Sequence, residues 1–153
     1  MRLTVHTDYA LRMLIYLALC APERSTIQEI AEAYGISKNH LMKVAHELGR
    51  AGWVETLRGR GGGLRLKGRP AAIRVGAVVR RMEEDFRLVE CFDAATDTCK
   101  ISPSCRLKGA LAEAQRAFIS VLNGYTLADL VEAPKPLARL LGIPGPRRGR
   151  SPS

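Results

Sequence analysis

The chain has 153 residues and a formal net charge of +9, and hydrophobic residues make up 46% of it. This balance predicts a packed core, and the low aromatic share of 5% favours helices over a β-sandwich. The basic excess favours a polyanionic partner, and no apolar stretch approaches the ~20 residues of a membrane span, so we expect a cytoplasmic protein with no membrane partner.

The first predicted helix covers residues 7–19. Apolar residues recur there at helical spacing, namely Ala10, Leu11, Leu14, Leu17 and Ala18. Thr7 occupies the place of an N-cap, with Asp8 favourable in the first turn. Pro22 marks the end of this helix.

Two capped helices follow and predict a helix-turn-helix. The segment from Ser25 to Gln28 has the form of a capping box, and Gly35 stands where the end of a helix needs a left-handed residue. After a tight turn, Ser37 caps a further helix that we expect to end at Gly52. The inner face of this helix is apolar, with Leu41, Val44, Ala45 and Leu48. A short helix, a tight turn and a second capped helix are typical of this motif.

Residues 53–66 predict a wing directly after the second helix of the motif. Residues 53–57 read as a strand, residues 58–63 as a basic glycine-rich turn, and residues 64–66 alternate apolar and charged as a returning strand does. The predicted fold class is therefore mainly α, with a winged helix-turn-helix domain over residues 1–80.

The second helix of such a motif enters the major groove of double-stranded DNA by its N-terminal end. The polar residues that we expect to contact DNA there are Ser37, Lys38, Asn39, His40 and Lys43. The wing adds Arg58 and Arg60. Asparagine can bond adenine in a bidentate way, and lysine can reach guanine or phosphate. Each residue alone is typical of solvated surface, but a capped helix pair, a basic wing and a positive charge in this order predict DNA binding. The aromatic stacking faces of RNA-binding modules are missing.

The second half of the chain contains a long predicted helix over residues 107–123. Its apolar residues have 4-3-4-3 spacing: Leu107, Leu111, Ala114, Phe118 and Val121. This spacing favours a partner helix in a homodimer, although a core-facing helix of a monomer would show the same pattern. Pro70 opens another predicted helix before it, residues 90–104 look irregular, and residues 126–129 cap a short turn. We assign residues 81–132 to a cysteine-rich cluster loop with a dimerisation helix, and residues 133–153 to a flexible basic tail.

Three of the four cysteines, Cys91, Cys99 and Cys105, lie within or beside the irregular segment. Structural disulfides are rare in a reducing compartment, so metal or redox chemistry gains weight. The spacing is neither that of zinc fingers nor that of the usual ferredoxins. Three thiolates in one loop could hold zinc, an iron–sulfur cluster or nothing, and the polar neighbours Asp93 and Asp97 argue against a buried apolar role.

A four-iron cluster needs a fourth ligand, and the N-terminal options are Cys20 and Asp8. Twelve residues separate them, which is about 18 Å along a helix, so they cannot both bind one compact cluster from the same chain. Residue chemistry alone favours Cys20, because thiolate suits iron better than carboxylate does.

Four motifs carry a family resemblance: the opening residues 1–12, the helix-turn-helix over residues 30–41, the Gly61–Leu64 wing and the cysteine triplet. On these motifs the chain resembles the Rrf-type family of iron–sulfur winged-helix regulators, over residues 1 to about 132. The sequences Cys99–Lys108 and Tyr125–Leu130 are most similar to the branch of this family that senses nitric oxide.

The resemblance implies a homodimeric repressor that binds operator DNA while its cluster is intact. Nitric oxide would then nitrosylate the cluster iron, release the DNA and derepress genes of nitric oxide detoxification. It also implies that the fourth ligand is Asp8 from the other subunit rather than Cys20, with Arg12 holding that carboxylate from one turn further along. A four-iron, four-sulfide (4Fe-4S) cluster is favoured, with a 2Fe-2S cluster as the alternative.

Several other functions stay open at this stage. One alternative is a related iron–sulfur regulator that senses cluster supply or redox state. Another is a zinc-stabilised DNA-binding protein that senses no signal. An electron-transfer protein would have no use for a reading helix and wing. No nucleophile–base pair or phosphate loop is present in the sequence, so we do not expect an enzyme.

Overall fold

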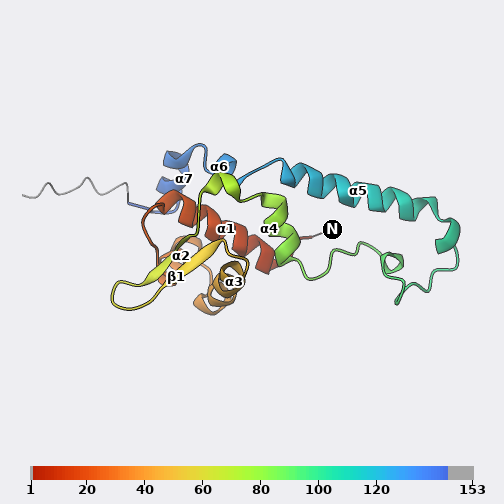
Figure 1. Ribbon diagram of the computed structural model, residues 1–153, viewed down its shortest axis with the longest axis horizontal. Coiled ribbons are helices and arrows are strands. Elements are labelled where there is room, and N and C mark those ends of the chain that lie inside the picture. The colour runs from red at the N-terminus through yellow and green to blue at the C-terminus, as the bar shows by residue number, and fades with distance from the viewer. Residues whose placement is uncertain (1, 145–153) are drawn as a thin grey trace, which may run out of the picture.

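The computed structural model describes residues 2–144 and has the predicted fold, a mainly helical winged helix-turn-helix (Figure 1). The helices are α1 (Val5–Cys20), α2 (Ile27–Tyr34), α3 (Lys38–Arg50), α4 (Val75–Met82), α5 (Arg106–Asn123), α6 (Leu127–Leu130) and α7 (Pro134–Leu140). The strands β1 (Val54–Leu57) and β2 (Gly63–Leu66) form an antiparallel pair after α3. Single 3-10 turns cover Pro70–Ala72, Glu90–Phe92 and Ser102–Ser104.

Helix α1 is the centre of the main core. Its side chains Met13, Leu14 and Leu17 are fully buried and pack with apolar residues of α2 and α3. On α3 the buried residues are Leu41, Val44, Ala45 and Leu48, which confirms the predicted inner face. The opposite face of α3 is therefore free to meet a partner.

Helix α1 begins earlier than predicted, and its N-cap is Thr4 rather than Thr7. The hydroxyl oxygen of Thr4 accepts a hydrogen bond from the backbone N–H of Thr7 at 3.3 Å. Thr7 lies inside the helix and is fully buried, and its hydroxyl lies 3.1 Å from that of Thr4. The prediction of Thr7 as the cap was wrong because two threonines stand three residues apart, and the tertiary fold buries the second one.

The capping box of α2 also lies one residue from its predicted place. Thr26 caps the backbone N–H of Glu29, and the Glu29 carboxylate accepts from the backbone N–H of Thr26 at 2.6 Å. Ser25 is buried and pairs by its backbone with Leu64 of β2, so it is not the cap. Gly35 ends α2 with a φ of 64°, the left-handed conformation that the sequence predicted.

The helix predicted to open at Pro70 starts only at Val75. Ile73 and Arg74 are extended, and this segment pairs with the backbone of residues 125–127: Leu127 N–H donates to the Ile73 carbonyl at 2.8 Å, and Val75 N–H, at the start of α4, donates to the Tyr125 carbonyl at 2.9 Å. This non-local pairing breaks the helix after one 3-10 turn. It also ties the C-terminal end of α5 to the body, because Tyr125 comes just after Gly124, the C-cap of α5.

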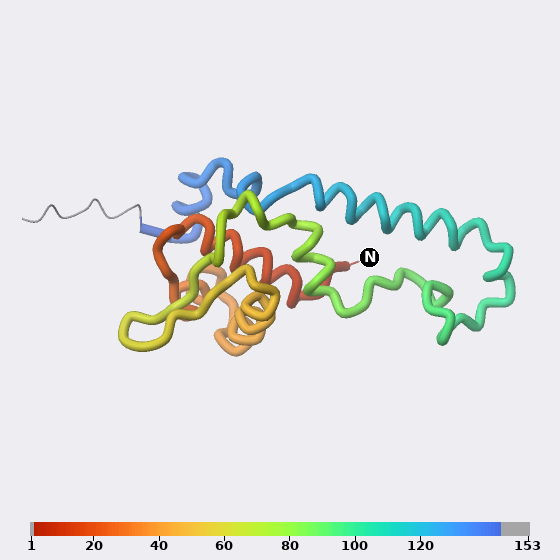
Figure 2. Tube along the Cα trace, viewed as in Figure 1, coloured from red at the N-terminus to blue at the C-terminus, as the bar shows by residue number. Residues whose placement is uncertain are grey.

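Helix α5 packs on α4 by its C-terminal half and projects beyond the body by its N-terminal half (Figure 2). Val75 and Val79 of α4 form a second small core with Ile119 of α5. The 18 residues of α5 make a helix of about 27 Å. The segment between α4 and α5 runs out along it to its far end (Figure 1).

Residues 134–143 return to the body, which corrects the predicted flexible tail for this part of residues 133–153. Residues 134–140 form α7, and Leu141 and Ile143 pack against the main core. The arginines of the expected basic tail, Arg147, Arg148 and Arg150, lie outside the described residues. Within residues 2–144, no helix is long and apolar enough to span a membrane.

Candidate DNA-reading face and cysteine loop

Helix α3 presents its predicted DNA-contacting residues together on one exposed surface. The exposed residues are Ser37, Lys38, Asn39, His40 and Lys43. The Ser37 hydroxyl accepts a hydrogen bond from the backbone N–H of His40 at 3.3 Å, which fixes the first turn of the helix. The polar first turn is therefore capped, exposed and on the side of α3 opposite to the core.

The wing places Arg58 and Arg60 on an exposed turn between β1 and β2. The turn needs glycine, because Gly59 and Gly61 have φ values of 92° and 76°. Arg65 on β2 is different: it forms an ion pair with Glu55 across the hairpin at 2.5 Å. Among residues 2–144, no ion pair occupies Arg58 or Arg60, so their charges are available to a ligand.

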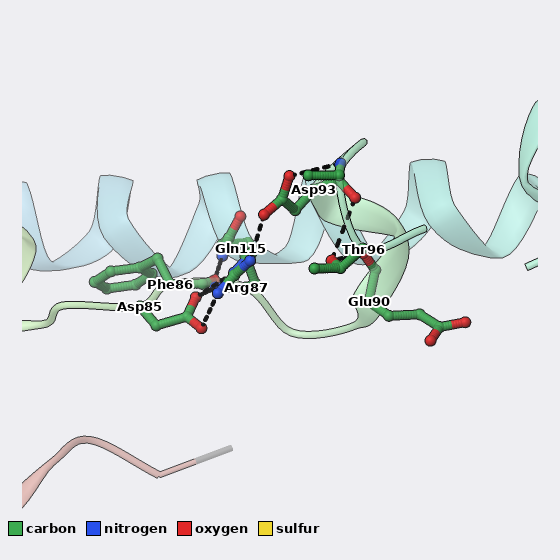
Figure 3. Close-up of polar contacts among 8 residues, drawn as sticks. Asp85, Phe86, Arg87, Glu90, Asp93, Thr96 and Gln115 are labelled. Carbon is green, nitrogen blue, oxygen red and sulfur yellow. Dashed lines mark hydrogen bonds and ion pairs between the residues drawn. The ribbon is translucent and has the colours of Figure 1, made fainter. Parts of the chain in front are cut away.

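The first half of the cysteine loop, residues 85–98, is anchored by Arg87 (Figure 3). Arg87 bonds both Asp85, at 2.8 Å, and Asp93 further along the loop. These bonds from Arg87 lower the pKa of Asp85 to about 2. The Gln115 side chain of α5 donates to the backbone carbonyl of Phe86, so the loop is attached to the middle of that helix.

The second half of the loop is organised around Asp97. Its carboxylate accepts from the backbone N–H of Cys99 at 3.1 Å and from the Ser102 hydroxyl, and the Lys108 ammonium of α5 lies 3.6 Å away. The Ser102 hydrogen bond is the largest cause of the lowered pKa of Asp97. These contacts connect the segment from Cys99 to Cys105 to the first turn of α5. Sequence patterns do not indicate the roles of Arg87, Ser102 and Lys108, because the path of the loop alone decides which partners they have.

The three loop cysteines are free and partly buried. Cys91 lies in the turn Glu90–Phe92, and Cys105 is the N-cap of α5, where its sulfur accepts from the backbone N–H of Lys108 at 3.4 Å. Hydrogen bonds to sulfur are typical of cluster-binding thiolates. In the part of the chain that the structure describes, no three His, Cys, Asp or Glu side chains are gathered closely enough to bind a metal ion. The donor set fits an iron–sulfur cluster or zinc, and the loop must draw its thiols together to bind either.

Asp8 lies near the start of α1 and forms an ion pair with Arg12 at 2.7 Å, as the spacing of one turn suggested. The Arg12 guanidinium also lies 5.9 Å from the ring centres of Tyr9 and of Tyr34. Tyr9 in turn contacts His40 of the reading helix, with ring centres 6.0 Å apart. A continuous set of side chains thus connects the Asp8 carboxylate with the first turn of α3.

Cys20 lies at the opposite end of α1 and packs against the main core. Burial raises the pKa of its thiol, against a smaller opposing effect of a hydrogen bond with Ser25. The loop cysteines lie in a segment that extends away from the body beside α5 (Figure 2). Between residues 2 and 144, Asp8 pairs with Arg12 and Cys20 bonds Ser25, and neither forms a hydrogen bond or ion pair with the loop.

A capped second helix with an exposed basic first turn, followed by a basic wing, defines a DNA-binding winged-helix protein. A family model described as an iron-dependent transcriptional regulator, Rrf2, matches residues 3–133. The chain belongs to the Rrf2 family. It is 56% identical over 142 residues to the HTH-type transcriptional regulator NsrR of Bacillus subtilis, and the aligned region covers 92% of this chain and 97% of that protein. The NsrR of Geobacillus kaustophilus is 53% identical with the same coverage.

Solved structures agree with this assignment. CymR of B. subtilis, named as a global cysteine regulator, superposes with a TM-score of 0.71 and 25% identity, over 86% of this chain and 97% of its own. IscR of T. potens has a TM-score of 0.69 at 23% identity over 86% and 87% of the two chains, a likeness of fold. The protein is thus a transcriptional regulator of the NsrR type, and its relatives are named as regulators rather than enzymes.

Proposed function

We propose that the protein is a homodimeric cytoplasmic repressor that binds double-stranded operator DNA with an intact iron–sulfur cluster, 4Fe-4S rather than 2Fe-2S, and leaves it on exposure to nitric oxide. Its targets would be genes of nitric oxide detoxification. The observation that carries the proposal is the loop with three free, partly buried cysteines, in a chain so similar to proteins named NsrR.

Each predicted residue has a defined task in this proposal. Cys91, Cys99 and Cys105 would bind the cluster, and Asp8 of the second subunit would be the fourth ligand. A bound cluster supplies iron that reacts with nitric oxide. The projection of the loop away from the α1 of its own chain supports a ligand from a second copy (Figure 1). Ser37, Lys38, Asn39, His40 and Lys43 would enter the major groove, and Arg58 and Arg60 would contact DNA through the wing.

Arg12 is the residue that would connect cluster binding at Asp8 with DNA binding by α3. It holds the Asp8 carboxylate by the 2.7 Å ion pair and also contacts Tyr9, which packs on His40. When Asp8 loses its position, Arg12 and Tyr9 lose part of their support, and α3 can shift. The two reading helices of a dimer must match one DNA turn of roughly 34 Å, so a small shift is enough to weaken binding.

An anaerobic titration with nitric oxide tests this proposal. We expect a brown protein whose iron–sulfur absorbance falls as operator DNA is released in a gel shift. Cys99→Ser should abolish the absorbance and weaken operator binding. Asp8→Ala should weaken operator binding, whereas Glu113→Ala, which removes an exposed carboxylate from α5, should leave it unchanged.

Other outcomes would contradict the proposal at separate points. If Asp8→Ala leaves operator binding and the nitric oxide response unchanged, Asp8 is not the cluster ligand that connects the two subunits. A colourless protein with one zinc per chain would identify a zinc-stabilised regulator. An operator complex insensitive to nitric oxide but lost on iron starvation would identify a sensor of cluster supply.

A further inference from the structure

Arg24 lies beside the wing although it precedes the helix-turn-helix in the sequence. The next residue, Ser25, pairs with Leu64 of β2 through two backbone hydrogen bonds, of 2.8 Å and 2.7 Å. A single β-bridge therefore joins the segment before α2 to the wing. This pairing fixes where the exposed Arg24 side chain begins.

The Arg24 side chain lies against the bare backbone of Gly61. A Cβ atom placed on Gly61 would lie 2.6 Å from the Nη2 atom of Arg24 and 3.3 Å from its Cζ atom. Any larger residue would push the guanidinium away, so glycine serves a second purpose here besides its φ of 76°. Gly59, in the same turn, has a φ of 92° and no heavy atom within 4 Å of such a Cβ.

The charge of Arg24 has no carboxylate partner among residues 2–144. The arginines that do form ion pairs there are Arg12, Arg50, Arg65 and Arg87. Arg24 thus resembles Arg58 and Arg60 rather than Arg65, whose charge is paired with Glu55. A positioned guanidinium without a partner presents a planar fork of donors that matches a phosphate group.

We propose that Arg24 contacts a backbone phosphate of DNA next to the groove that the wing enters, and that Gly61 positions it. This inference rests on the DNA-reading face proposed above and adds to it a residue from outside the helix-turn-helix and the wing turn. A phosphate contact positions a protein on DNA without reading its sequence. The effect of Arg24 should therefore be the same on any duplex.

The test measures binding of Arg24→Gln to two labelled duplexes over a range of salt concentrations. One duplex is an operator selected from a random pool with the wild-type protein, and the other has random sequence. We expect affinity to fall about tenfold on both. The slope of log K against log salt should shrink by about 0.9 for each lost contact, or about 1.8 in a dimer. Arg24→Lys should retain most of the slope.

Arg139→Gln is the matched control, because it removes one exposed positive charge from α7, on the other side of α1 from α3 (Figure 1). Equal slopes for Arg24→Gln and Arg139→Gln would overturn the proposal. So would a loss confined to the operator duplex, which would mean base reading. A melting temperature shared with the wild type shows that the wing still folds.

A double-mutant cycle tests the role of Gly61. Gly61→Ala should cost affinity partly by displacing Arg24, so its cost should shrink in the Arg24→Gln background. Gly59→Ala introduces the same kind of backbone strain but no contact with Arg24, so its loss of affinity should be the same in the wild-type and Arg24→Gln backgrounds. If the affinity losses of Gly61→Ala and Arg24→Gln simply add in the double variant, Gly61 does not position Arg24. Failure of the wild type to bind either duplex would instead contradict the proposed function itself.

Discussion

The four cysteines have two distinct environments, and the difference decides their chemistry. Cys20 is packed against the main core at the end of α1, and burial raises the pKa of its thiol. The loop cysteines lie in the irregular segment between α4 and α5, outside either core. Because the thiolate is the nucleophile, a raised pKa slows reaction at neutral pH.

We predict that iodoacetamide modifies Cys91, Cys99 and Cys105 faster than Cys20 in the reduced, cluster-free protein. The rate at Cys20 should rise only at a pH above the ordinary pKa of a thiol, because burial in the folded protein disfavours its thiolate. Mass spectrometry of peptides at successive times measures this order. In urea, where burial is lost, Cys20 should become as reactive as the other three, and equal rates in the folded protein would contradict the prediction.

At the residue scale the sequence predicted correctly which side of α3 is buried and which is exposed, for a physical reason. Helical periodicity and the Ser37 cap together decide which side of α3 is buried, so the opposite side follows. Arg24 could not be predicted in this way. Its contact with Gly61 exists only because Ser25 pairs with Leu64, and no local pattern encodes that pairing.

At the scale of elements, the crossing of α4 and α5 depends on a single glycine. Gly76 of α4 is buried, and a Cβ atom there would lie 2.8 Å from the backbone nitrogen of Asn123 and even nearer to its side chain. Backbone cannot move aside as a flexible side chain can. The crossing therefore sets how α5, and with it the cysteine loop, projects from the winged helix.

We predict that Gly76→Ala lowers the free energy of unfolding by about 1–3 kcal/mol through overpacking. Gly109→Ala is the matched control within α5, since no heavy atom lies within 4 Å of its Cβ position. That change should raise stability by about 0.5–1 kcal/mol, because alanine favours a helix interior. Urea denaturation followed by circular dichroism measures both. A stable Gly76→Ala variant would show that the two helices separate at little cost.

The helix boundaries show where sequence patterns stop being sufficient. Thr4 and Thr7, or Ser25 and Thr26, offer alternative caps, and tertiary contacts choose between them. Helix α7 was missed because prolines usually end helices. Pro134 and Pro136 lie in its first turn, where the missing N–H groups have no helical partner to lose.

At the scale of the whole molecule, α5 has an apolar stripe that the described residues 2–144 leave uncovered. Leu107 and Val121 are 64% and 62% exposed, and the alanines 110, 114 and 117 between them are exposed as well. Phe118 of the predicted seam packs instead on the second core, so the exposed stripe is rotated from the predicted one. The spacing of the stripe is 3-4-3-4, which suits a second α5.

We predict that Leu107→Glu with Val121→Glu converts the proposed dimer into a monomer and abolishes operator binding. Two like charges facing their copies in an apolar seam would each lose hydration without gaining a partner. Sedimentation measures the mass, and a gel shift measures operator binding. Ser120→Glu, on the polar side of α5, should remain dimeric and bind DNA, since the charge it adds stays in water. A double variant that stays dimeric would place the interface on another surface and would leave this stripe without a role in pairing. A variant that becomes monomeric yet binds the operator with unchanged affinity would contradict the second half of the prediction, because it would show that one copy of α3 is sufficient for binding.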